Sequence, residues 1–200
     1  VVESDWSAAS YYYSLVALSK IGTQLIVRNL FKNSLQADSA CVNIYKNFGI
    51  ETSFENNEIV VSKISEANIS KFELDFIQCP DIAQTVVCTC IGLNVPFKFT
   101  GLQTLKVKET DRITALQNEL KKFGYVMETI DNTMQWMNQK VIANDNLSIA
   151  TYNDHRMAMC FAPLCLLHEN IIIENAEVVS KSYPLFWEDV KHIGINQTLV

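Results

Sequence analysis

Residues 108–112, Lys-Glu-Thr-Asp-Arg, bring two cations close to the carboxylate of Glu109. The cations, Lys108 and Arg112, can bind a phosphate, and a carboxylate beside that phosphate can transfer a proton. The stretch therefore indicates an anion site that contains a titratable group. The alternative is a solvated helix end, in which Glu109 and Arg112 form a surface ion pair three residues apart.

A helix is expected to present these residues. Apolar side chains recur at spacings of three and four from Ile113 to Phe123, which predicts a helix over 110–123. Thr110 is the expected N-cap, and Gly124 suits the left-handed position that follows a helix. The unpaired N–H groups and the positive dipole end at the start of this helix favour an anion there.

The composition describes a chain that can bury a substantial core and that carries a net negative charge. Hydrophobic residues make up 48% of the 200 residues, and the formal net charge at pH 7 is −6. This charge argues against a general nucleic-acid surface, so any anion site must be a local concentration of Lys and Arg. No apolar run approaches the roughly 20 residues that span a bilayer, so we expect no membrane contact. The chain opens with Val and shows no targeting segment, and we expect a piece of a longer protein.

The cysteines are scattered through apolar runs and include no Cys-x-x-Cys pair. They are Cys41, Cys79, Cys88, Cys90, Cys160 and Cys165. A zinc site or a disulfide framework would need closer or more regular spacing, so we expect reduced core thiols and a cytoplasmic protein.

Helical and strand patterns follow one another in three similar rounds. The first round predicts a helix over 5–20 with Asp5 or Ser7 as its cap, a strand over 24–27, a helix over 34–48, and a hairpin of strands 50–54 and 59–62. The second predicts a strand over 72–77, a helix over 81–93, a strand over 96–100, the helix over 110–123, and a hairpin over 125–138 that turns at 131–132. The third predicts a strand over 147–151, a helix over 154–167 that Pro163 should kink, a strand over 171–174, and a helix over 183–193.

A related tripeptide ends one helix in each round: Phe-Gly-Ile at 48–50, Phe-Gly-Tyr at 123–125 and Ile-Gly-Ile at 193–195. The offsets of 75 and 70 residues are too long for a solenoid of short units. We therefore expect a single α/β domain over 1–200, built from three modules at approximately 1–65, 66–140 and 141–200.

The unusual polar residues stand at the expected helix starts. Asp81 follows Pro80, Asn-Asp-His-Arg occupies 153–156, and Lys181 precedes the last helix. If the modules share a pseudo-threefold axis, these helix starts converge with residues 108–112. Four cations and several helix dipoles would then form a positive hollow on an otherwise acidic protein, for which an anionic small molecule is the natural ligand.

Five motifs in order resemble the 5-enolpyruvylshikimate-3-phosphate synthase family. They are Lys-Glu-Thr-Asp-Arg at 108–112, Tyr-Asn-Asp-His-Arg-Met-Ala-Met at 152–159, Pro80-Asp81 with Thr85, Asp5 with the run from Ser7 to Tyr11, and Lys-Ser-Tyr-Pro at 181–184. The resemblance runs from one end of the chain to the other and covers roughly the C-terminal half of a family member.

The resemblance implies one domain of the family's inside-out α/β barrel, made of three βαβαββ units with the first strand missing. It also implies transfer of the enolpyruvyl group of phosphoenolpyruvate to the 5-hydroxyl of shikimate 3-phosphate, with release of phosphate. No metal and no organic cofactor are implied. The expected partners are the two substrates and the missing N-terminal domain, without which this chain should be inactive.

Carried over to this sequence, the resemblance assigns Asp81 to the shikimate hydroxyls and makes it the base toward the attacking one. Lys108 is assigned to shikimate 3-phosphate, and the carboxylate and phosphate of phosphoenolpyruvate are assigned to Arg112, Arg156 and Lys181. Arginine forks suit bidentate recognition of oxyanions, and the lysine acts as a point charge.

Proton transfer at the methylene carbon of phosphoenolpyruvate is assigned to Glu109. His155 joins the catalytic group, and Asp154 joins the substrate-binding group beside it. The family commonly has Asn where Thr104 stands, so the assignment of Thr104 to substrate binding departs from the family's pattern.

Two other functions compete with this interpretation. One is the related enolpyruvyl transferase that acts on UDP-N-acetylglucosamine, which lacks the Lys-Glu-Thr-Asp-Arg signature. The other is a domain that binds phosphorylated metabolites, or acts as a scaffold, without catalysis. A pure scaffold would have no physical reason to keep Asp81, Glu109 and Arg112 together.

Overall fold

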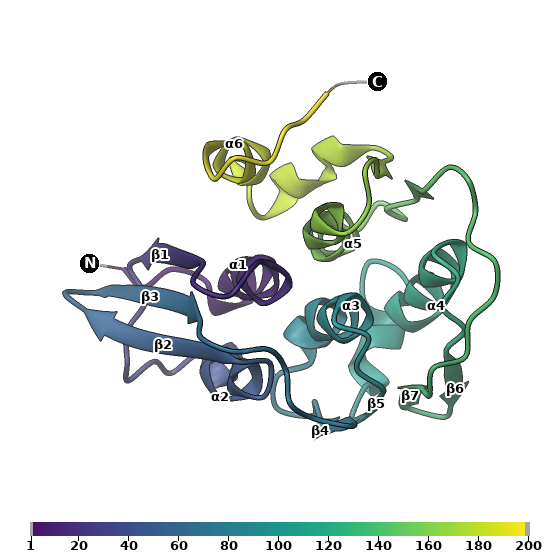
Figure 1. The fold of residues 1–200 in the computed structure, drawn as a ribbon, viewed down its shortest axis with the longest axis horizontal. Helices are drawn as coiled ribbons and strands as arrows, with labels where there is room; N and C mark the ends of the chain where they lie inside the picture. The colour runs from purple at the N-terminus through teal and green to yellow at the C-terminus, as the bar shows by residue number, and fades with distance from the viewer. Residues whose placement is uncertain (1, 199–200) are drawn as a thin grey trace.

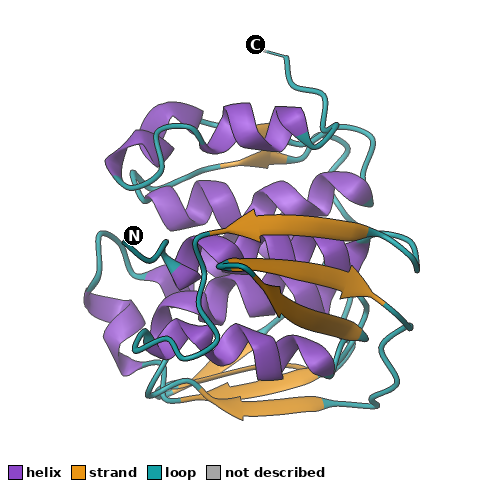
Figure 2. Cartoon of the chain, turned by 90° about the vertical axis from the view of Figure 1, so that its left-hand side faces the viewer, coloured by secondary structure: helices purple, strands orange, loops and turns teal. Residues whose placement is uncertain are grey.

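The computed structural model describes residues 2–198. Helices α1, α3 and α5 lie side by side in the middle of the molecule, with their axes running in roughly the same direction (Figures 1 and 2). A three-stranded sheet, a four-stranded sheet and a two-stranded sheet lie outside them. None of the helices within residues 2–198 is long and apolar enough to cross a membrane.

The first sheet comes from the first third of the chain and faces the viewer in Figure 2. Its elements, with the helices between them, are α1 (Trp6–Leu18), β1 (Gln24–Arg28), α2 (Cys41–Lys46), β2 (Ile50–Glu55) and β3 (Glu58–Lys63). The strand order is β1-β3-β2, and both pairings are antiparallel. The predicted hairpin of two strands before residue 65 is confirmed.

The second sheet has the order β4-β5-β7-β6. Its elements are β4 (Phe72–Asp75), α3 (Ala83–Gly92), β5 (Phe97–Thr100), α4 (Arg112–Lys122), β6 (Glu128–Ile130) and β7 (Thr133–Trp136). Strand β4 runs parallel to β5, and the other pairings are antiparallel. The pairing of β5, β7 and β6 repeats that of β1, β3 and β2. Within the described residues β1 has no counterpart of β4 beside it, which matches the expectation of a unit without its first strand.

The last part of the chain adds a short parallel pair of strands and two helices. They are β8 (Ser148–Ile149), α5 (His155–Phe161), β9 (Ile172–Ile173) and α6 (Phe186–His192). The mixed α/β fold is as expected, whereas the boundaries of the three modules stay a prediction.

Several predicted helices are shorter than their sequence patterns. The helix expected over 34–48 begins at Ala37 with a 3-10 turn and becomes α2 at Cys41. Its first residues are held away from helical geometry, because Ser34 Oγ and Gln36 Nε2 both donate to the Glu3 carboxylate, at 2.8 and 3.2 Å. A tertiary contact therefore overrides the local pattern.

Proline explains two other differences. Helix α5 ends at Phe161 and continues as a 3-10 helix over Ala162–Leu166, because Pro163 supplies no N–H. This agrees with the predicted kink. The last helix begins at Phe186 rather than at Tyr183, which precedes Pro184 and is therefore disfavoured in the helical conformation.

The helix predicted over 110–123 is α4. Its N-cap is Asp111, so the prediction of Thr110 was wrong: the Asp111 carboxylate accepts from the Ile113 and Thr114 N–H groups. Its end was predicted correctly, since Gly124 has φ 88°. A Cβ at Gly124 would lie 2.6 Å from the carbonyl oxygen of Val141, so the close approach of that segment also requires glycine.

The core lies between the helices and the inner faces of the sheets and is rich in aromatic residues. Its largest fully buried side chains include Trp6, Tyr11, Tyr13, Tyr45, Phe48, Phe76, Phe97, Phe99, Trp136, Phe161 and Phe186. Five of the six cysteines are buried, and Cys165 is half-buried. Burial raises the pKa of the Cys41, Cys90 and Cys160 thiols well above the ordinary value.

Candidate active site

The starts of three helical segments meet around Asp81, which lies in the 3-10 turn that leads into α3. Three cations reach its carboxylate: Lys108 Nζ at 3.1 Å, Arg112 Nη1 at 3.4 Å and Arg156 Nη2 at 3.3 Å. Burial alone would raise the pKa of Asp81, but these three cations together outweigh burial and hold it below the ordinary value. Asp81 is therefore ionised at neutral pH. Of the four helix starts predicted to converge, the three that carry Asp81, residues 108–112 and residues 153–156 meet here, whereas Lys181 does not reach Asp81.

Arg112 is fixed from behind by Asp154. Its Nε lies 2.7 Å from Asp154 Oδ2, and its Nη2 lies 3.3 Å from Oδ1. Both side chains are buried, with 2% of Arg112 and none of Asp154 exposed. Burial raises the pKa of Asp154, but the hydrogen bonds and charge of Arg112 outweigh it, so the pKa is lowered. Because the two oxygens of Asp154 are used by protein groups, the side chain holds Arg112 in one orientation.

Asp154 also begins α5. One of its oxygens accepts from the Arg156 N–H at 2.9 Å, which is an N-cap bond. The same residue thus sets the position of Arg112 on α4 and the start of the helix that carries Arg156. The Arg156 guanidinium donates from Nη2 to the Asp81 carboxylate and from Nη1 to the Asp81 carbonyl, both at 3.3 Å.

Glu109 lies on the open side of this cluster. Its Oε2 is 3.3 Å from Arg112 Nη2 and 3.2 Å from His155 Nδ1. The second contact is close without hydrogen-bond geometry, so within the described residues Nδ1 is buried without a hydrogen-bond partner. Burial lowers the pKa of His155 and outweighs the opposing effect of Glu109, which favours the neutral imidazole.

Glu109, Asp154 and His155 offer oxygen and nitrogen atoms within 4.8 Å of one another, close enough to hold a metal ion. However, both carboxylates already contact the Arg112 guanidinium. A fixed cation therefore neutralises the acidic groups on which a metal would depend, and the geometry favours an arginine-centred site.

Two predicted residues lie farther from the cluster. Lys181 is exposed, and its Nζ donates to the carbonyl and to Oδ1 of Asn153, at 2.6 and 3.1 Å. It is thus joined to the residue just before Asp154. Thr104 is exposed in the 3-10 helix Gln103–Val107, and within residues 2–198 no hydrogen bond connects its side chain to the cluster.

Asp38 was missed by the sequence analysis. It lies in the 3-10 turn before α2 and accepts a hydrogen bond from Ser7 Oγ. Burial raises the pKa of Asp38. The nearby charge of Arg156 opposes this rise, and the charge of Asp81 adds to it. No local sequence signal points to Asp38, because its partner Ser7 lies 31 residues away in the chain.

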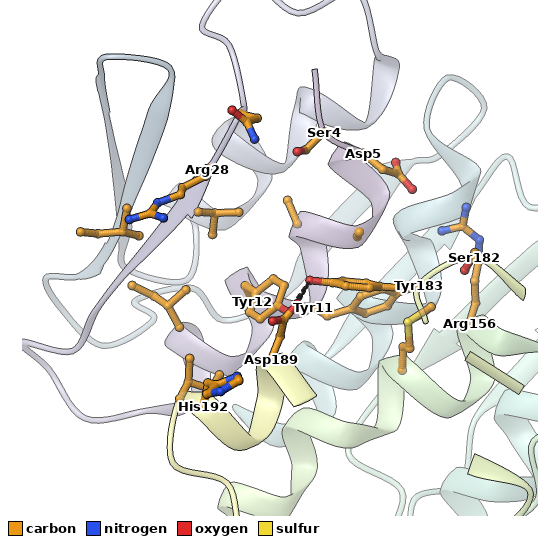
Figure 3. A pocket seen from close by; sticks show the side chains of 18 residues that line it. Ser4, Asp5, Tyr11, Tyr12, Arg28, Arg156, Ser182, Tyr183, Asp189 and His192 are labelled. Carbon is orange, nitrogen blue, oxygen red and sulfur yellow. Dashed lines mark hydrogen bonds between the residues drawn. The ribbon is translucent and has the colours of Figure 1, made fainter. Parts of the chain in front are cut away.

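One cavity adjoins the cluster without coinciding with it. A cavity of about 550 Å³ lies between α1, β1 and α6 (Figure 3). Arg156 reaches one end of it, whereas Asp81, Lys108 and Arg112 are absent from its lining. Inside the cavity Tyr183 donates to Asp189 Oδ2 at 2.6 Å and lies 2.8 Å from the Tyr12 hydroxyl. We assign the candidate site to the charged cluster, because the cavity lacks a comparable concentration of cations.

Comparisons with known proteins agree with the resemblance found in the motifs. The family model described as EPSP synthase (3-phosphoshikimate 1-carboxyvinyltransferase) matches residues 1–190. A 3-phosphoshikimate 1-carboxyvinyltransferase from Bacteroides fragilis is 44% identical over 96% of this chain and 47% of its own length. One from Methanospirillum hungatei is 33% identical over 99% of this chain and 45% of its own length. The chain therefore spans about half the length of the curated relatives it matches.

Solved structures show the same fold at lower sequence similarity. Two structures of EPSP synthase from Acinetobacter baumannii superpose with TM-scores of 0.72 and 0.74, at 21% and 20% identity. The matches cover 98% and 100% of this chain and 47% of each EPSP synthase chain.

Proposed function

The chain belongs to the EPSP synthase family, and from that premise we propose that it forms one wall of an enolpyruvyl transferase. The reaction transfers the enolpyruvyl group of phosphoenolpyruvate to the 5-hydroxyl of shikimate 3-phosphate and releases phosphate. The names of the two relatives favour this reaction over transfer to UDP-N-acetylglucosamine. The observation that carries the proposal is the cluster of Lys108, Arg112 and Arg156 around one ionised carboxylate, Asp81.

The cluster supports binding of two anionic substrates. Without a ligand, Lys108 and Arg156 both pair with the one carboxylate of Asp81, whereas Arg112 also contacts Glu109 and Asp154. A phosphate or a carboxylate can therefore bind with little rearrangement, through charge-assisted hydrogen bonds from the two guanidinium groups. We assign Lys108 to shikimate 3-phosphate, and Arg112 and Arg156 to phosphoenolpyruvate.

Asp81 is proposed as the base for the 5-hydroxyl. A lowered pKa keeps it ionised but makes it a weak base. Substrate anions that bind Lys108 and Arg156 would draw those cations away and raise the pKa of Asp81 toward its ordinary value. Substrate binding would thus make the carboxylate a stronger base at the moment it is needed.

Glu109 is proposed to move the proton at the methylene carbon. As the hydroxyl oxygen bonds to the central carbon, its proton passes to Asp81, and the methylene carbon takes up a proton from protonated Glu109 and becomes a methyl group. In the second step a methyl proton returns to the protein, the double bond re-forms, and the bond to phosphate breaks. His155 Nδ1 lies 3.2 Å from Glu109 Oε2, and a rotation of either side chain into hydrogen-bond geometry would let the two groups exchange a proton.

Asp154, Thr104 and Lys181 are also assigned to substrate binding. The full use of the Asp154 carboxylate by Arg112 and by the start of α5 favours an indirect contribution to substrate binding. Lys181 would have to leave Asn153 to reach phosphoenolpyruvate, and Thr104 would have to face the missing wall. We also expect the reaction to take place in the cytoplasm.

The experiment that tests the function is phosphate release from the two substrates. The full-length protein should show steady turnover, and the 200-residue chain alone should show none. The second wall supplies closure and orientation, which can be worth on the order of 7–11 kcal/mol. Activity that appears only when the chain is mixed with the separately expressed remainder would support the two-wall arrangement. Steady turnover by the chain alone would refute it, and a full-length protein without turnover would refute the function.

Glu109→Gln in the full-length protein tests the assigned chemistry. The amide keeps the size of the side chain and one acceptor oxygen but cannot transfer the proton, so kcat should fall far more than KM changes. A matched control is Glu128→Gln, an exposed glutamate on β6. A loss of roughly tenfold or less in kcat would reduce Glu109 to a positioning residue.

A further inference from the structure

Glu119 is a buried carboxylate for which the reaction has no direct use. It lies on α4, and only 1% of it is exposed. Seven residues, or about two helical turns, separate it from Arg112, so the two side chains leave the same face of the helix roughly 10 Å apart. An ionised group is rarely buried to this degree unless several donors satisfy it.

The donors come mainly from the segment that leads into the site. Glu119 Oε2 accepts from the Ala150 N–H at 3.0 Å, and Oε1 accepts from the Tyr152 hydroxyl at 2.8 Å. Lys122 Nζ lies 2.6 Å from Oε2 and donates also to the Ser148 carbonyl at 2.8 Å. The carboxylate therefore connects α4 to residues 148–152, directly and through Lys122.

The connected segment contains an unfavourable turn. Tyr152 and Asn153 have φ values of 54° and 57°, so two consecutive residues with side chains adopt the left-handed conformation. Such residues are strained and persist only where the surrounding structure holds them in place. The Glu119 bonds to Ala150 and Tyr152 supply such a hold.

The turn determines where the site residues lie. Its Asn153 carbonyl accepts from Lys181, and the next residue, Asp154, holds Arg112 and begins the helix that carries Arg156. Helix α4 thus contacts residues 150–154 at two points: Arg112 contacts Asp154, and Glu119 contacts Ala150 and Tyr152. If the Glu119 contacts were lost, the turn could relax. The segment that positions Lys181, Arg112 and Arg156 relative to one another would then shift.

We propose that Glu119 is a positioning residue for the anion site, acting through the Tyr152–Asn153 turn. This inference rests on the proposed function for its connection to catalysis, but not for its connection to anion binding. Burial, followed by the bond to Glu119, raises the pKa of Tyr152, so its hydroxyl stays protonated and available as a donor. The competing explanation is that Glu119 only stabilises the fold.

Glu119→Gln in the full-length protein separates the two explanations. The amide keeps one acceptor oxygen but presents N–H groups in place of the other, and it loses the charge that pairs with Lys122, so the connection to Ala150 and Tyr152 should weaken. We expect about tenfold weaker binding of inorganic phosphate in calorimetry, the size expected when a buried donor loses its partner. The KM for phosphoenolpyruvate should rise with it. The controls are Glu128→Gln, an exposed carboxylate, and Ile59→Val, which lowers stability in the other sheet.

Tyr152→Phe is the second variant, for the case in which Glu119→Gln does not fold. It removes one bond to Glu119 from a side chain that is 37% exposed, so folding should persist. Phosphate binding should weaken in the same direction, but less than in Glu119→Gln.

A merely structural role would lower the thermal midpoint without changing the phosphate Kd or the KM beyond the Ile59→Val control. That result, or an unchanged phosphate Kd in Tyr152→Phe if Glu119→Gln fails to fold, would overturn the proposal. A wild-type protein that binds phosphate but transfers no enolpyruvyl group would refute the proposed function. Because phosphate binding would still be measurable in that case, the role of Glu119 would still be decided.

Discussion

Asp111 and Asp154 cap neighbouring helices with the same chemistry. Asp111 accepts from the Ile113 and Thr114 N–H groups at the start of α4, at 3.1 and 3.2 Å, and its side chain is exposed. Asp154 accepts from the Arg156 N–H at the start of α5, but it is fully buried and also holds the Arg112 guanidinium. The difference shows that a cap becomes part of a site when burial and a second partner give it a cation to position.

The largest expected effect comes from removing the buried cap. Asp154→Ala leaves the Arg112 guanidinium buried without its main partner, so the free energy of unfolding should fall by about 3–5 kcal/mol. Urea unfolding of the wild type and the variant measures it. A loss no larger than that of Asp111→Ala would contradict the view that the two caps differ in kind.

A somewhat smaller effect concerns stabilisation by ligand. Phosphate at about 100 times its Kd should stabilise the folded chain by about 2.7 kcal/mol through mass action. The corresponding rise in thermal midpoint should shrink in Arg112→Ala and Arg156→Ala and persist in Asp111→Ala. Equal rises in the wild type and the two arginine variants would place the anion site elsewhere.

Acid should reveal the ionic part of the buried cap. The pKa of Asp154 is lower in the folded chain than its ordinary value of 3.8, so the folded state binds fewer protons than the unfolded state. The stability contributed by Asp154 is therefore complete well above pH 3.8, and it is lost as the pH falls through the lower folded pKa. Asp154→Asn should be less stable than the wild type at neutral pH and should lose less on acidification. Parallel stability curves for the two proteins would show that the pair is not ionic.

The smallest effect is expected from Asp111→Ala. Loss of an exposed N-cap should cost about 1 kcal/mol in the free energy of unfolding, with no change in the phosphate Kd. Urea unfolding and calorimetry on one preparation test both parts. A weaker phosphate Kd would mean that the exposed cap also helps to position Arg112, which follows it directly.

The same contrast explains how much could be predicted from the sequence. Helix and strand order follows from local periodicity, and the end of α4 follows from the one residue, Gly124, that readily adopts φ 88°. The residues of the charged cluster were found because motifs place them at helix starts. Element order, the end of α4 and the cluster residues each depend on a signal in neighbouring residues, and contacts with distant segments do not change it.

The rest depended on contacts between distant segments. Thr110 and Asp111 are both good caps, and only the backbone direction decides which side chain reaches the N–H groups of α4. Asp38 and Glu119 look like ordinary helix-surface acids, because their partners Ser7 and Ala150 lie 31 residues away in the chain. Their burial is a property of the assembled fold.

The rates at which the buried thiols react with an alkylating reagent report how often the core opens locally. Cys160 is four residues beyond Arg156 on α5, and burial raises its pKa, so the reactive thiolate is scarce while the helix stays packed. Half-buried Cys165, in the following 3-10 helix, offers an internal comparison on the same segment. The order in which an alkylating reagent labels the two records how often α5 leaves the core. An anion that binds Arg156 should stabilise the packed helix and slow the alkylation of Cys160.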